Sequence, residues 1–394
     1  MSIVLIRGNT STVLVDTETS TVRVVFVWIW YSNGVHLINT SATFIYMNAK
    51  IAINGFGRIG RGFMRGAHGR EGLNIVAVND LSQAENLAYL LKYDSVYGRA
   101  PFEVKAAERA LVVGGKTVTL TAEKDPAAIP WKALGVDIVV EATGLFTDPV
   151  KARAHITAGA KRVVVTAPLK SVDSSGANGA SAETILIGAN EEKFGAIGNG
   201  KCEITSNASC TTNAASPLIG ILDEAVGIER AILNTTHAYT ASQSLVDGGK
   251  AKDLREQRAA AINMVPTSTG AAKATALAYP QLKGKFDGVS VRVPLASGSL
   301  VDITFVAKRA TTPEEINAAL KAAAATDRWK RVFAVSEEPL VSSDILGLPY
   351  GSIADLAMTR VVDGTLVKVL AWYDNEMGYV HTLVEHVLEV AKRL

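Results

Sequence analysis

The sequence predicts an α/β protein with two domains: one built on a doubly wound parallel sheet, the other an α+β domain with a largely antiparallel sheet. Three observations predict it. Short apolar runs alternate with helical stretches from Met47 onward, a later segment alternates with period two, and 394 residues suffice for two domains with sizeable cores.

The alternation of strands and helices predicts the parallel sheet. The strand candidates are residues 51–54, 74–79, 136–141 and 162–166, and helical stretches such as 148–158 lie between them. This order of strand, helix and strand is typical of an open parallel sheet with helical crossovers.

The first strand runs into a G-x-G-x-x-G turn that opens a helix. Gly55 permits the tight turn, Gly57 lets a pyrophosphate approach the backbone, and Gly60 lets helix and strand pack closely. Asp80 follows 20 residues after the last glycine, at the end of the second strand, where its carboxylate can bind a ribose diol and repel a 2′-phosphate. The sequence therefore predicts a Rossmann-type site for NAD rather than NADP.

Alternation later in the chain predicts the second sheet. Val289, Val291 and Val293 share one face of an expected strand, and Ser290 and Arg292 share the other. This pattern indicates a half-buried strand in a more antiparallel sheet.

Two helices are expected in the last third of the chain. Residues 312–315 (TPEE) supply a capping threonine, a proline in the first turn and acids at the positive end of a helix. The final segment has a helical stripe of apolar residues that must dock on another element, at positions 380, 383, 384, 387, 388 and 391.

Composition narrows the classes of partner and compartment. The net charge of +2 gives no reason to expect nucleic acid or a membrane as the main partner, and no apolar run reaches the length of about 18 residues that spans a bilayer. Two cysteines, Cys202 and Cys210, do not form a disulfide framework, so we expect reduced thiols and a cytoplasmic protein.

Residues 1–46 differ in composition from the rest of the chain, with no lysine and only four charged residues. Residues 22–31, Asn33-Gly34 and 35–38 favour a β-hairpin. The segment is either an added β-arm or targeting segment, or upstream sequence included by the choice of start codon, and we favour the second interpretation. We expect a chain that begins at Met47 to fold, to turn over and to be more soluble.

Cys210 is the candidate nucleophile. It stands in the segment 206–213 (SNASCTTN), just before an apolar-periodic stretch, so it falls at the start of a helix, where the dipole favours a thiolate. A buried structural cysteine is the competing interpretation, and the one we give Cys202. Of six histidines, His237 is the best candidate base because it ends an apolar run and opens a polar one.

Two further features resemble anion sites. Residues 267–270 (TSTG) precede an alanine-rich helix, so hydroxyl and N–H groups meet at its positive end. Arg292 is a lone cation on the polar face of its strand, suited to a phosphate, although a solvated surface arginine fits the sequence equally well.

The motifs NGFGRIGR, SNASCTTN, THAYT, PTSTGAAKA, VRVP and WYDNEMGY, in this order, resemble the phosphorylating glyceraldehyde-3-phosphate dehydrogenases. The resemblance extends from about Met47 to Leu394. It implies an NAD-binding domain at 47–208 and 375–394, a catalytic domain at 209–374, a last helix that returns to the first domain, a homotetramer and a role in glycolysis or gluconeogenesis.

The resemblance also implies a role for each matching residue. Cys210 is the nucleophile and His237 is the acid/base. The aldehyde reacts with Cys210 to give a hemithioacetal, which is then oxidised to a thioester. The substrate-phosphate residues are Thr240 and Arg292. The inorganic-phosphate residues are Ser209, Thr211 and Thr269. The cofactor residues are Gly55, Phe56, Gly57, Arg58, Ile59, Gly60, Asp80, Thr143, Thr166, Asn375 and Tyr379. No metal is implied.

The chain departs from the family's common pattern at three places. Ala214 stands where many members have a second cysteine, and Gly249 replaces a proline near the adenosine ribose. Residues 174–181 (SSGANGAS) are atypical for the family, and we expect this polar stretch to lengthen a loop after Pro168. Two other functions remain open: erythrose-4-phosphate dehydrogenase, and an NAD-binding scaffold without catalysis.

Overall fold

The computed structural model describes residues 30–31, 34–35, 48–170, 181–197, 202–249, 251 and 253–394. The chain divides into two compact units, Met1–Asn48 and Ala49–Leu394. In the first unit, β1 (Trp30–Tyr31) and β2 (Gly34–Val35) pair antiparallel, with Tyr31 opposite Gly34. Gly34 thus lies in a strand and not in the turn of the predicted hairpin. The remainder of the predicted hairpin, and residues 174–180 of the predicted loop, fall outside the described residues.

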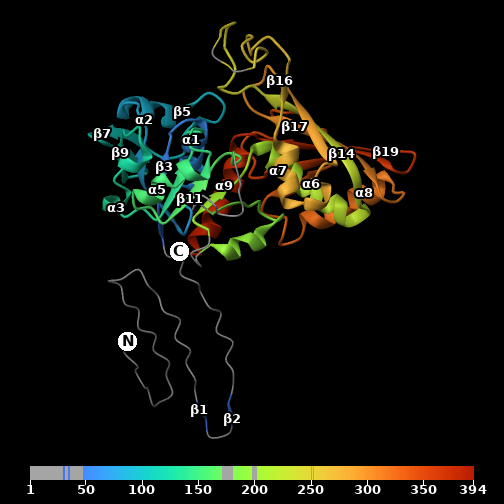
Figure 1. The fold of residues 1–394 in the computed structure, drawn as a ribbon, viewed down its shortest axis with the longest axis horizontal. Coiled ribbons are helices and arrows are strands. Elements are labelled where there is room, and N and C mark those ends of the chain that lie inside the picture. Colours follow the sequence, from blue (N-terminus) through green and yellow to red (C-terminus); the bar gives the residue numbers. More distant parts are fainter. Residues whose placement is uncertain are drawn as a thin grey trace. The chain divides into compact units, whose positions relative to one another are not determined.

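The second unit contains two large sheets (Figure 1). The first has the strand order β12-β13-β11-β10-β3-β4-β9-β8-β7 and is parallel from β12 to β9, with β8 and β7 antiparallel at one edge. Its strands are β3 (Ala49–Asn54), β4 (Leu73–Asn79), β7 (Val104–Ala107), β8 (Ala110–Val113), β9 (Lys116–Thr121), β10 (Ile138–Glu141), β11 (Arg162–Val165), β12 (Ala182–Thr184) and β13 (Ile204–Ser206).

Helices connect these strands as crossovers, which confirms the predicted parallel domain. They are α1 (Arg58–Ala67), α2 (Ala84–Lys92), α3 (Trp131–Leu134), α4 (Pro149–Ala152) and α5 (Ala154–Thr157). The single helix predicted over 148–158 is two short helices. Arg153 separates them, but its φ of −60° and ψ of −20° keep the right-handed helical direction.

The second sheet has the strand order β15-β16-β14-β17-β20-β19-β18. Its pairs are antiparallel except β14 with β16 and β18 with β19, as the predicted largely antiparallel domain requires. The strands are β14 (Ile228–Ala238), β15 (Val265–Ser268), β16 (Phe286–Val293), β17 (Ser299–Ala307), β18 (Phe333–Ser336), β19 (Ser352–Val362) and β20 (Leu366–Tyr373).

Three helices pack on this sheet and on one another: α6 (Cys210–Val226), α7 (Ala271–Ala278) and α8 (Pro313–Ala324). The predicted start of α8 is confirmed, because the Thr312 hydroxyl accepts a hydrogen bond from the Glu315 N–H at 3.3 Å. The half-buried character predicted for β16 is confirmed, but a serine of its polar face is more buried than a valine of the other face. Ser290 is 3% exposed and Val289 is 52% exposed, because the inner face of this strand lines a polar cavity.

The last helix, α9 (Met377–Ala391), lies beside α1 of the first sheet's domain, and Figure 1 shows the two helices together. A Cβ atom on Gly62 or Gly66 of α1 would come within 2.9 Å of Val380. The predicted apolar stripe is buried at Val380, 383, 384 and 387. Small residues on α1 and branched residues on α9 therefore pack together and dock the end of the chain on the domain of the first sheet.

Candidate active site

Cys210 is the first residue of α6, as the sequence predicts. Ser209 caps the helix, since its hydroxyl accepts a hydrogen bond from the Thr212 N–H at 3.1 Å. The residue before the cap, Ala208, has a φ of +52°, an uncommon conformation for a side chain with a Cβ atom. Its N–H donates to Ser206 Oγ at 2.9 Å, and its carbonyl accepts from the Tyr379 hydroxyl at 3.1 Å. These bonds hold the strained turn that presents the thiol.

His237 lies near the end of β14, and its Nε2 atom is 3.4 Å from Cys210 Sγ. Burial, with the charge of Arg292, lowers the pKa of His237 to about 3, so the imidazole is neutral near neutral pH. Burial raises the pKa of the Cys210 thiol, while the charge of Arg292 and hydrogen bonds with Thr211 oppose that rise. The helix dipole alone therefore does not yield a thiolate, and a neutral base in contact with the thiol can accept its proton.

Arg292 lies beside His237 on the neighbouring strand, β16. Its Nη1 atom is 2.5 Å from His237 Nδ1 and 3.3 Å from the Ala238 carbonyl oxygen. The Ala238 carbonyl is also 2.6 Å from His237 Nδ1. A guanidinium only donates, so Nδ1 accepts from Arg292 in one tautomer and donates to Ala238 in the other.

A cavity of about 190 Å³ joins the predicted nucleophile, base and anion ligands. It is lined by Pro168, Ser209, Cys210, Thr211, His237, Ser268, Thr269, Gly270, Ala271, Ser290 and Arg292. Thr240, predicted with Arg292 at a substrate phosphate, is not among them, and its hydroxyl is 3.0 Å from Ser242 Oγ.

Tyr373 connects two elements of the site through its hydroxyl group. This role was not predicted from the sequence, although Tyr373 is part of the WYDNE motif. Its hydroxyl is 2.9 Å from Thr211 Oγ1 and 2.7 Å from Thr235 Oγ1, and its ring meets the His237 ring edge to face. Burial raises the pKa of this phenol above its ordinary value, so it stays a neutral hydrogen-bonding group. Tyr373 thereby ties the start of α6 to β14.

The glycine turn fits a bound dinucleotide. Gly55 has a φ of +89°, and a Cβ atom there would lie 2.8 Å from the Thr143 backbone nitrogen. A Cβ atom on Gly60 would lie 2.1 Å from the Gly55 carbonyl oxygen. At Gly57, by contrast, an added Cβ meets no atom within 4 Å, so the start of α1 is open to the approach of a pyrophosphate.

Side chains far apart in sequence fix the turn. The Asp80 carboxylate accepts hydrogen bonds from the Phe56 N–H at 2.8 Å and the Ser82 N–H at 2.9 Å. Arg58 pairs with Asp94 and donates from Nε to Glu376 at 2.9 Å. The acid predicted for the ribose thus also holds the backbone of the phosphate-binding turn.

A buried polar network, which sequence reasoning did not find, lies at the carboxyl ends of the parallel strands. Glu141 accepts hydrogen bonds from Asn54 Nδ2 at 2.6 Å, from the Thr143 N–H at 2.9 Å and from His155 Nε2 at 3.0 Å. The indole of Trp131 donates to His155 Nδ1 at 3.0 Å, which places the His155 proton on Nε2, toward Glu141. This network holds Thr143 beside the glycine turn.

Two more predicted cofactor residues come from the end of the chain. Asn375 is buried, and its Oδ1 atom accepts from the Gly298 N–H at 3.1 Å and Ser299 Oγ at 2.9 Å, which orients its amide. Tyr379 anchors the turn before Cys210. Thr166 follows β11, and its N–H bonds to the Glu141 carbonyl at 3.0 Å.

Two family models match the chain. Residues 49–149 match the glyceraldehyde 3-phosphate dehydrogenase NAD binding domain, and residues 209–375 match the C-terminal domain of the same family. The chain is 47% identical over 355 residues to the glyceraldehyde-3-phosphate dehydrogenase of Mycobacterium avium, covering 88% of this chain and 100% of that protein. The chain belongs to the glyceraldehyde-3-phosphate dehydrogenase family.

Other relatives in the family come from other bacteria. The chain is 46% identical to the Geobacillus stearothermophilus glyceraldehyde-3-phosphate dehydrogenase over 347 residues, with 88% of this chain and 99% of that protein covered. The Zymomonas mobilis enzyme of the same name is also 46% identical, over 350 residues. The NAD cofactor and the dehydrogenase class predicted from the motifs are thus confirmed.

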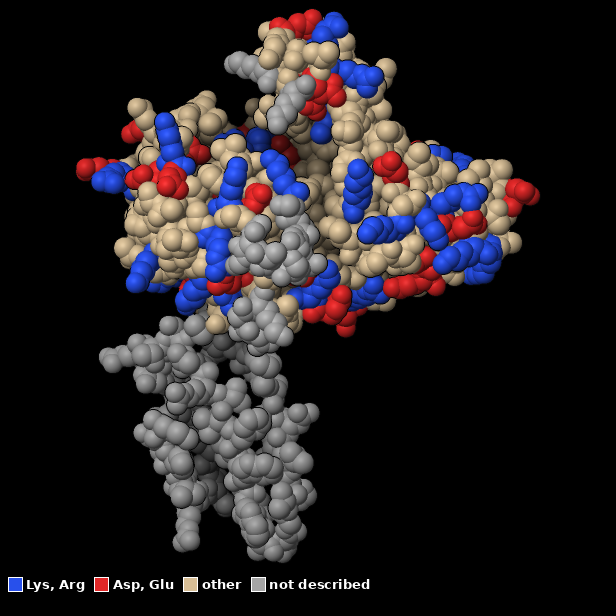
Figure 2. All heavy atoms as spheres, in the orientation of Figure 1, with Lys and Arg blue, Asp and Glu red and all other residues tan. Residues whose placement is uncertain are grey.

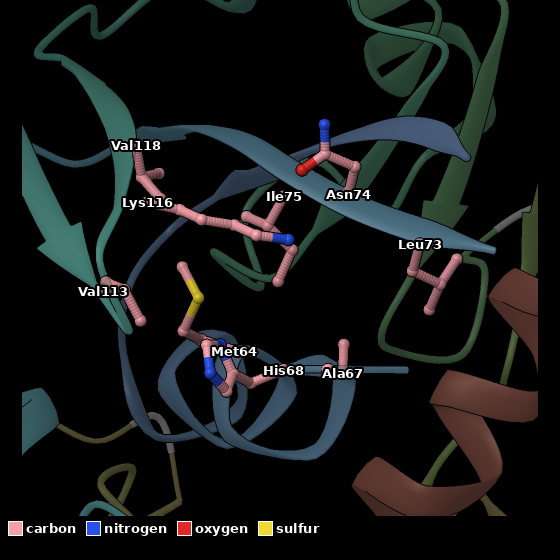
Figure 3. A pocket seen from close by; sticks show the side chains of 10 residues that line it. Met64, Ala67, His68, Leu73, Asn74, Ile75, Val113, Lys116 and Val118 are labelled. Carbon is pink, nitrogen blue, oxygen red and sulfur yellow. The ribbon is translucent and has the colours of Figure 1, made fainter. Parts of the chain in front are cut away.

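A second hollow lies away from the site, in the first sheet's domain. It measures about 30 Å³, adjoins Met64, His68 and Lys116, and has room for little more than water (Figure 3). On the face drawn in Figure 2, acidic and basic side chains are interspersed. Within the described ranges, no helix is long and apolar enough to cross a membrane, and no cluster of three metal-ligating side chains occurs.

Proposed function

We propose that Cys210 and His237 are the nucleophile and the acid/base in the oxidation of D-glyceraldehyde 3-phosphate to 1,3-bisphosphoglycerate with NAD and inorganic phosphate. The observation that carries the proposal is the 3.4 Å approach of His237 Nε2 to Cys210 Sγ within a cavity rich in hydroxyl groups. The names of the relatives supply the substrate. We also propose that residues 47–208 and 375–394 form the NAD-binding domain and that residues 209–374 form the catalytic domain.

The first half of the reaction begins with transfer of the Cys210 proton to the neutral imidazole of His237. The sulfur then forms a bond to the aldehyde carbon, and the imidazolium returns the proton to the developing oxyanion, which gives a hemithioacetal. His237 next removes that hydroxyl proton as the carbon is oxidised, and the product is a thioester on Cys210. NAD, when bound, accepts the hydride that this oxidation releases.

In the second half, an oxygen of inorganic phosphate attacks the thioester carbonyl. The carbon–sulfur bond breaks, its electron pair returns to Cys210 as a thiolate, and the acyl phosphate leaves. Ser209, Thr211 and Thr269 are the proposed ligands of this phosphate. Thr240 and Arg292 are the proposed ligands of the substrate's own phosphate. Two anion sites keep both reactants oriented at one carbon.

The proposed cofactor ligands surround the glycine turn and the nicotinamide end. Backbone groups from Gly55 to Gly60 hold the pyrophosphate, Asp80 binds the adenosine ribose, and Asn375 binds the nicotinamide amide. Thr143, Thr166 and Tyr379 complete the walls. Support for this arrangement comes from the open space at Gly57 and the oriented amide of Asn375.

We further propose a homotetramer in the cytoplasm. Large apolar side chains lie exposed on β14 and β16, with Ile232 58% and Val289 52% exposed. A second exposed apolar group follows β14 in the chain, with each side chain at least 72% exposed: Leu245, Val246, Leu254, Ile262 and Met264. Such patches favour association with further copies. Light scattering in solution tests the tetramer, and a monomer at micromolar concentration would contradict it.

The assignment of substrate is tested by following NADH formation with glyceraldehyde 3-phosphate and with erythrose 4-phosphate, each with and without inorganic phosphate. We expect phosphate-dependent turnover that favours the triose. A preference for the tetrose supports erythrose-4-phosphate dehydrogenase instead. If neither aldehyde reacts and iodoacetamide finds no reactive thiol, the protein is an NAD-binding scaffold.

The assignment of the nucleophile is tested by Cys210→Ser. An alcohol is not ionised near neutral pH, so NADH formation should fall below a few per cent of wild type while NAD binding is retained. Cys202→Ser is the matched control, because that thiol is buried and burial raises its pKa to about 11. Substantial turnover by Cys210→Ser would refute the assignment.

A further inference from the structure

We propose that the Ser290 hydroxyl is an additional ligand of inorganic phosphate, an inference that rests on the proposed function. Ser290 lies on β16, is 3% exposed and lines the cavity beside Cys210. Among the described residues, no group forms a hydrogen bond with its Oγ atom. Buried hydroxyls nearly always have a partner, so an unpartnered one on a residue that lines a cavity indicates a ligand that enters it.

The two residues paired with Ser290 in the sheet do not share this property. Thr235 on β14 and Thr267 on β15 lie directly across from it. The Thr235 hydroxyl is 2.7 Å from the Tyr373 hydroxyl and 3.2 Å from the Leu300 carbonyl oxygen. The Thr267 hydroxyl is 3.4 Å from the Ser268 carbonyl oxygen. In this row of three hydroxyls, only that of Ser290 is left for a ligand.

Two other donors face the same cavity. Arg292 lies two residues along β16, on the same face as Ser290, and its buried Nε atom also forms no hydrogen bond among the described residues. Helix α7 begins beside them at Ala271, whose N–H donates to Thr269 Oγ1, while the capping residue, Gly270, has no side chain to satisfy the N–H groups that follow. Hydroxyl, guanidinium and helix N-terminus all donate, so together they select an anion with several acceptor oxygens.

Arg292, a proposed ligand of the substrate's phosphate, is a neighbour of Ser290, but most of the proposed phosphate ligands that share its cavity belong to inorganic phosphate. Ser209, Thr211 and Thr269, the proposed ligands of inorganic phosphate, line the cavity with Ser290, whereas Thr240 does not. Thr269 also adjoins α7, since its hydroxyl accepts from the Ala271 N–H at 3.2 Å. A phosphate bound here would be held on several sides, next to the sulfur that carries the thioester.

The test compares Ser290→Ala with wild type in the two halves of the reaction. Loss of a hydrogen bond to a charged oxygen should raise the KM for inorganic phosphate roughly 10- to 100-fold. The KM for glyceraldehyde 3-phosphate and the NADH burst formed without phosphate should stay within about twofold, because acylation precedes the entry of phosphate. Ser290→Thr, which keeps a hydroxyl, should recover most of the phosphate affinity.

A binding measurement separates this role from a structural one. Inorganic phosphate alone should raise the melting temperature of wild type more than that of Ser290→Ala, while glycerol 3-phosphate should stabilise both equally. Ser352→Ala is the matched control, since Ser352 is fully buried, lacks a hydroxyl partner among the described residues and does not line the cavity. It should leave both shifts unchanged.

Each other outcome overturns the inference in a distinguishable way. A raised KM for the aldehyde in Ser290→Ala, with unchanged phosphate KM, would assign the hydroxyl to the substrate's phosphate. No change in either KM would leave it without a ligand role. Wild-type turnover that does not depend on phosphate would refute the proposed function itself.

Discussion

Arg292 donates from Nη1 to Nδ1 of His237 across 2.5 Å. Accepting this bond requires an unprotonated Nδ1, so the ring proton then lies on Nε2 and points at Cys210. An anion that draws Arg292 away lets Nδ1 donate to the Ala238 carbonyl, 2.6 Å distant, and leaves Nε2 able to accept the thiol proton. If Arg292 binds the substrate's phosphate as proposed, that phosphate would favour the tautomer of His237 that the reaction needs.

This contact predicts a change in thiol reactivity for Arg292→Gln. The charge of Arg292 lowers the pKa of Cys210, so its removal should move the rise of iodoacetamide alkylation rate to higher pH. The KM for glyceraldehyde 3-phosphate should also rise, by about 10-fold or more for a lost charge-assisted pair. Alkylation by stopped-flow over a range of pH measures the first effect.

Arg292→Lys is the control for charge. It keeps the positive charge without the planar fork, so its alkylation profile should stay near that of wild type although its substrate KM rises. If both variants alkylate like wild type at every pH, Arg292 does not tune the thiol.

His237→Asn should slow the oxidation by about 10² to 10⁴, the usual contribution of general acid–base catalysis. Asparagine preserves a polar side chain in the cavity but cannot carry the proton from Cys210 to the oxyanion. Single-turnover NADH formation measures the loss directly. A rate within about threefold of wild type would identify another base.

The sequence allowed prediction of the parts of the site that depend on neighbours along the chain. The glycine turn at Gly55, the acid after β4 and the thiol at the start of α6 follow from local conformation. The orientation of β16 did not follow, because alternation gives two faces but not which one covers a cavity. In the structure the face that carries Ser290 covers the cavity, so Ser290 is buried and Val289 is exposed.

Contacts that join distant segments were beyond pattern reasoning. Arg58 pairs with Glu376, 318 residues later, and Tyr373 links Thr211 to Thr235. Such pairs depend on how β20 packs within the second sheet and on how α9 returns to α1. Spacing carries no signal for them, although an arginine inside the glycine motif hints at a charged partner.

Asp80 should make the enzyme prefer NAD to NADP. Its carboxylate is fixed by the Phe56 and Ser82 N–H groups, so it cannot swing away from a 2′-phosphate. Asp80→Asn removes the charge yet keeps an acceptor oxygen for the turn, and should raise kcat/KM for NADP relative to NAD by about 10-fold, about 1.4 kcal/mol. Equal efficiency of the wild type with both cofactors would refute this role.

Because His386 is buried, we expect the free energy of unfolding to depend on pH. Its ring is fully buried in α9, Nε2 is 2.8 Å from Thr205 Oγ1, and burial lowers the pKa to about 3 from 6.5. Between these values the unfolded chain binds a proton that the folded chain does not, so stability falls as pH falls from about 6.5 toward about 3. This histidine alone contributes up to about 1.4 kcal/mol per pH unit to the slope, and His237 acts in the same direction.

His386→Gln retains a partner for Thr205 without titrating. Urea unfolding at about pH 7 and about pH 5 should show a smaller loss of unfolding free energy in the variant, and equal losses in the two proteins would mean that His386 is protonated in the folded state.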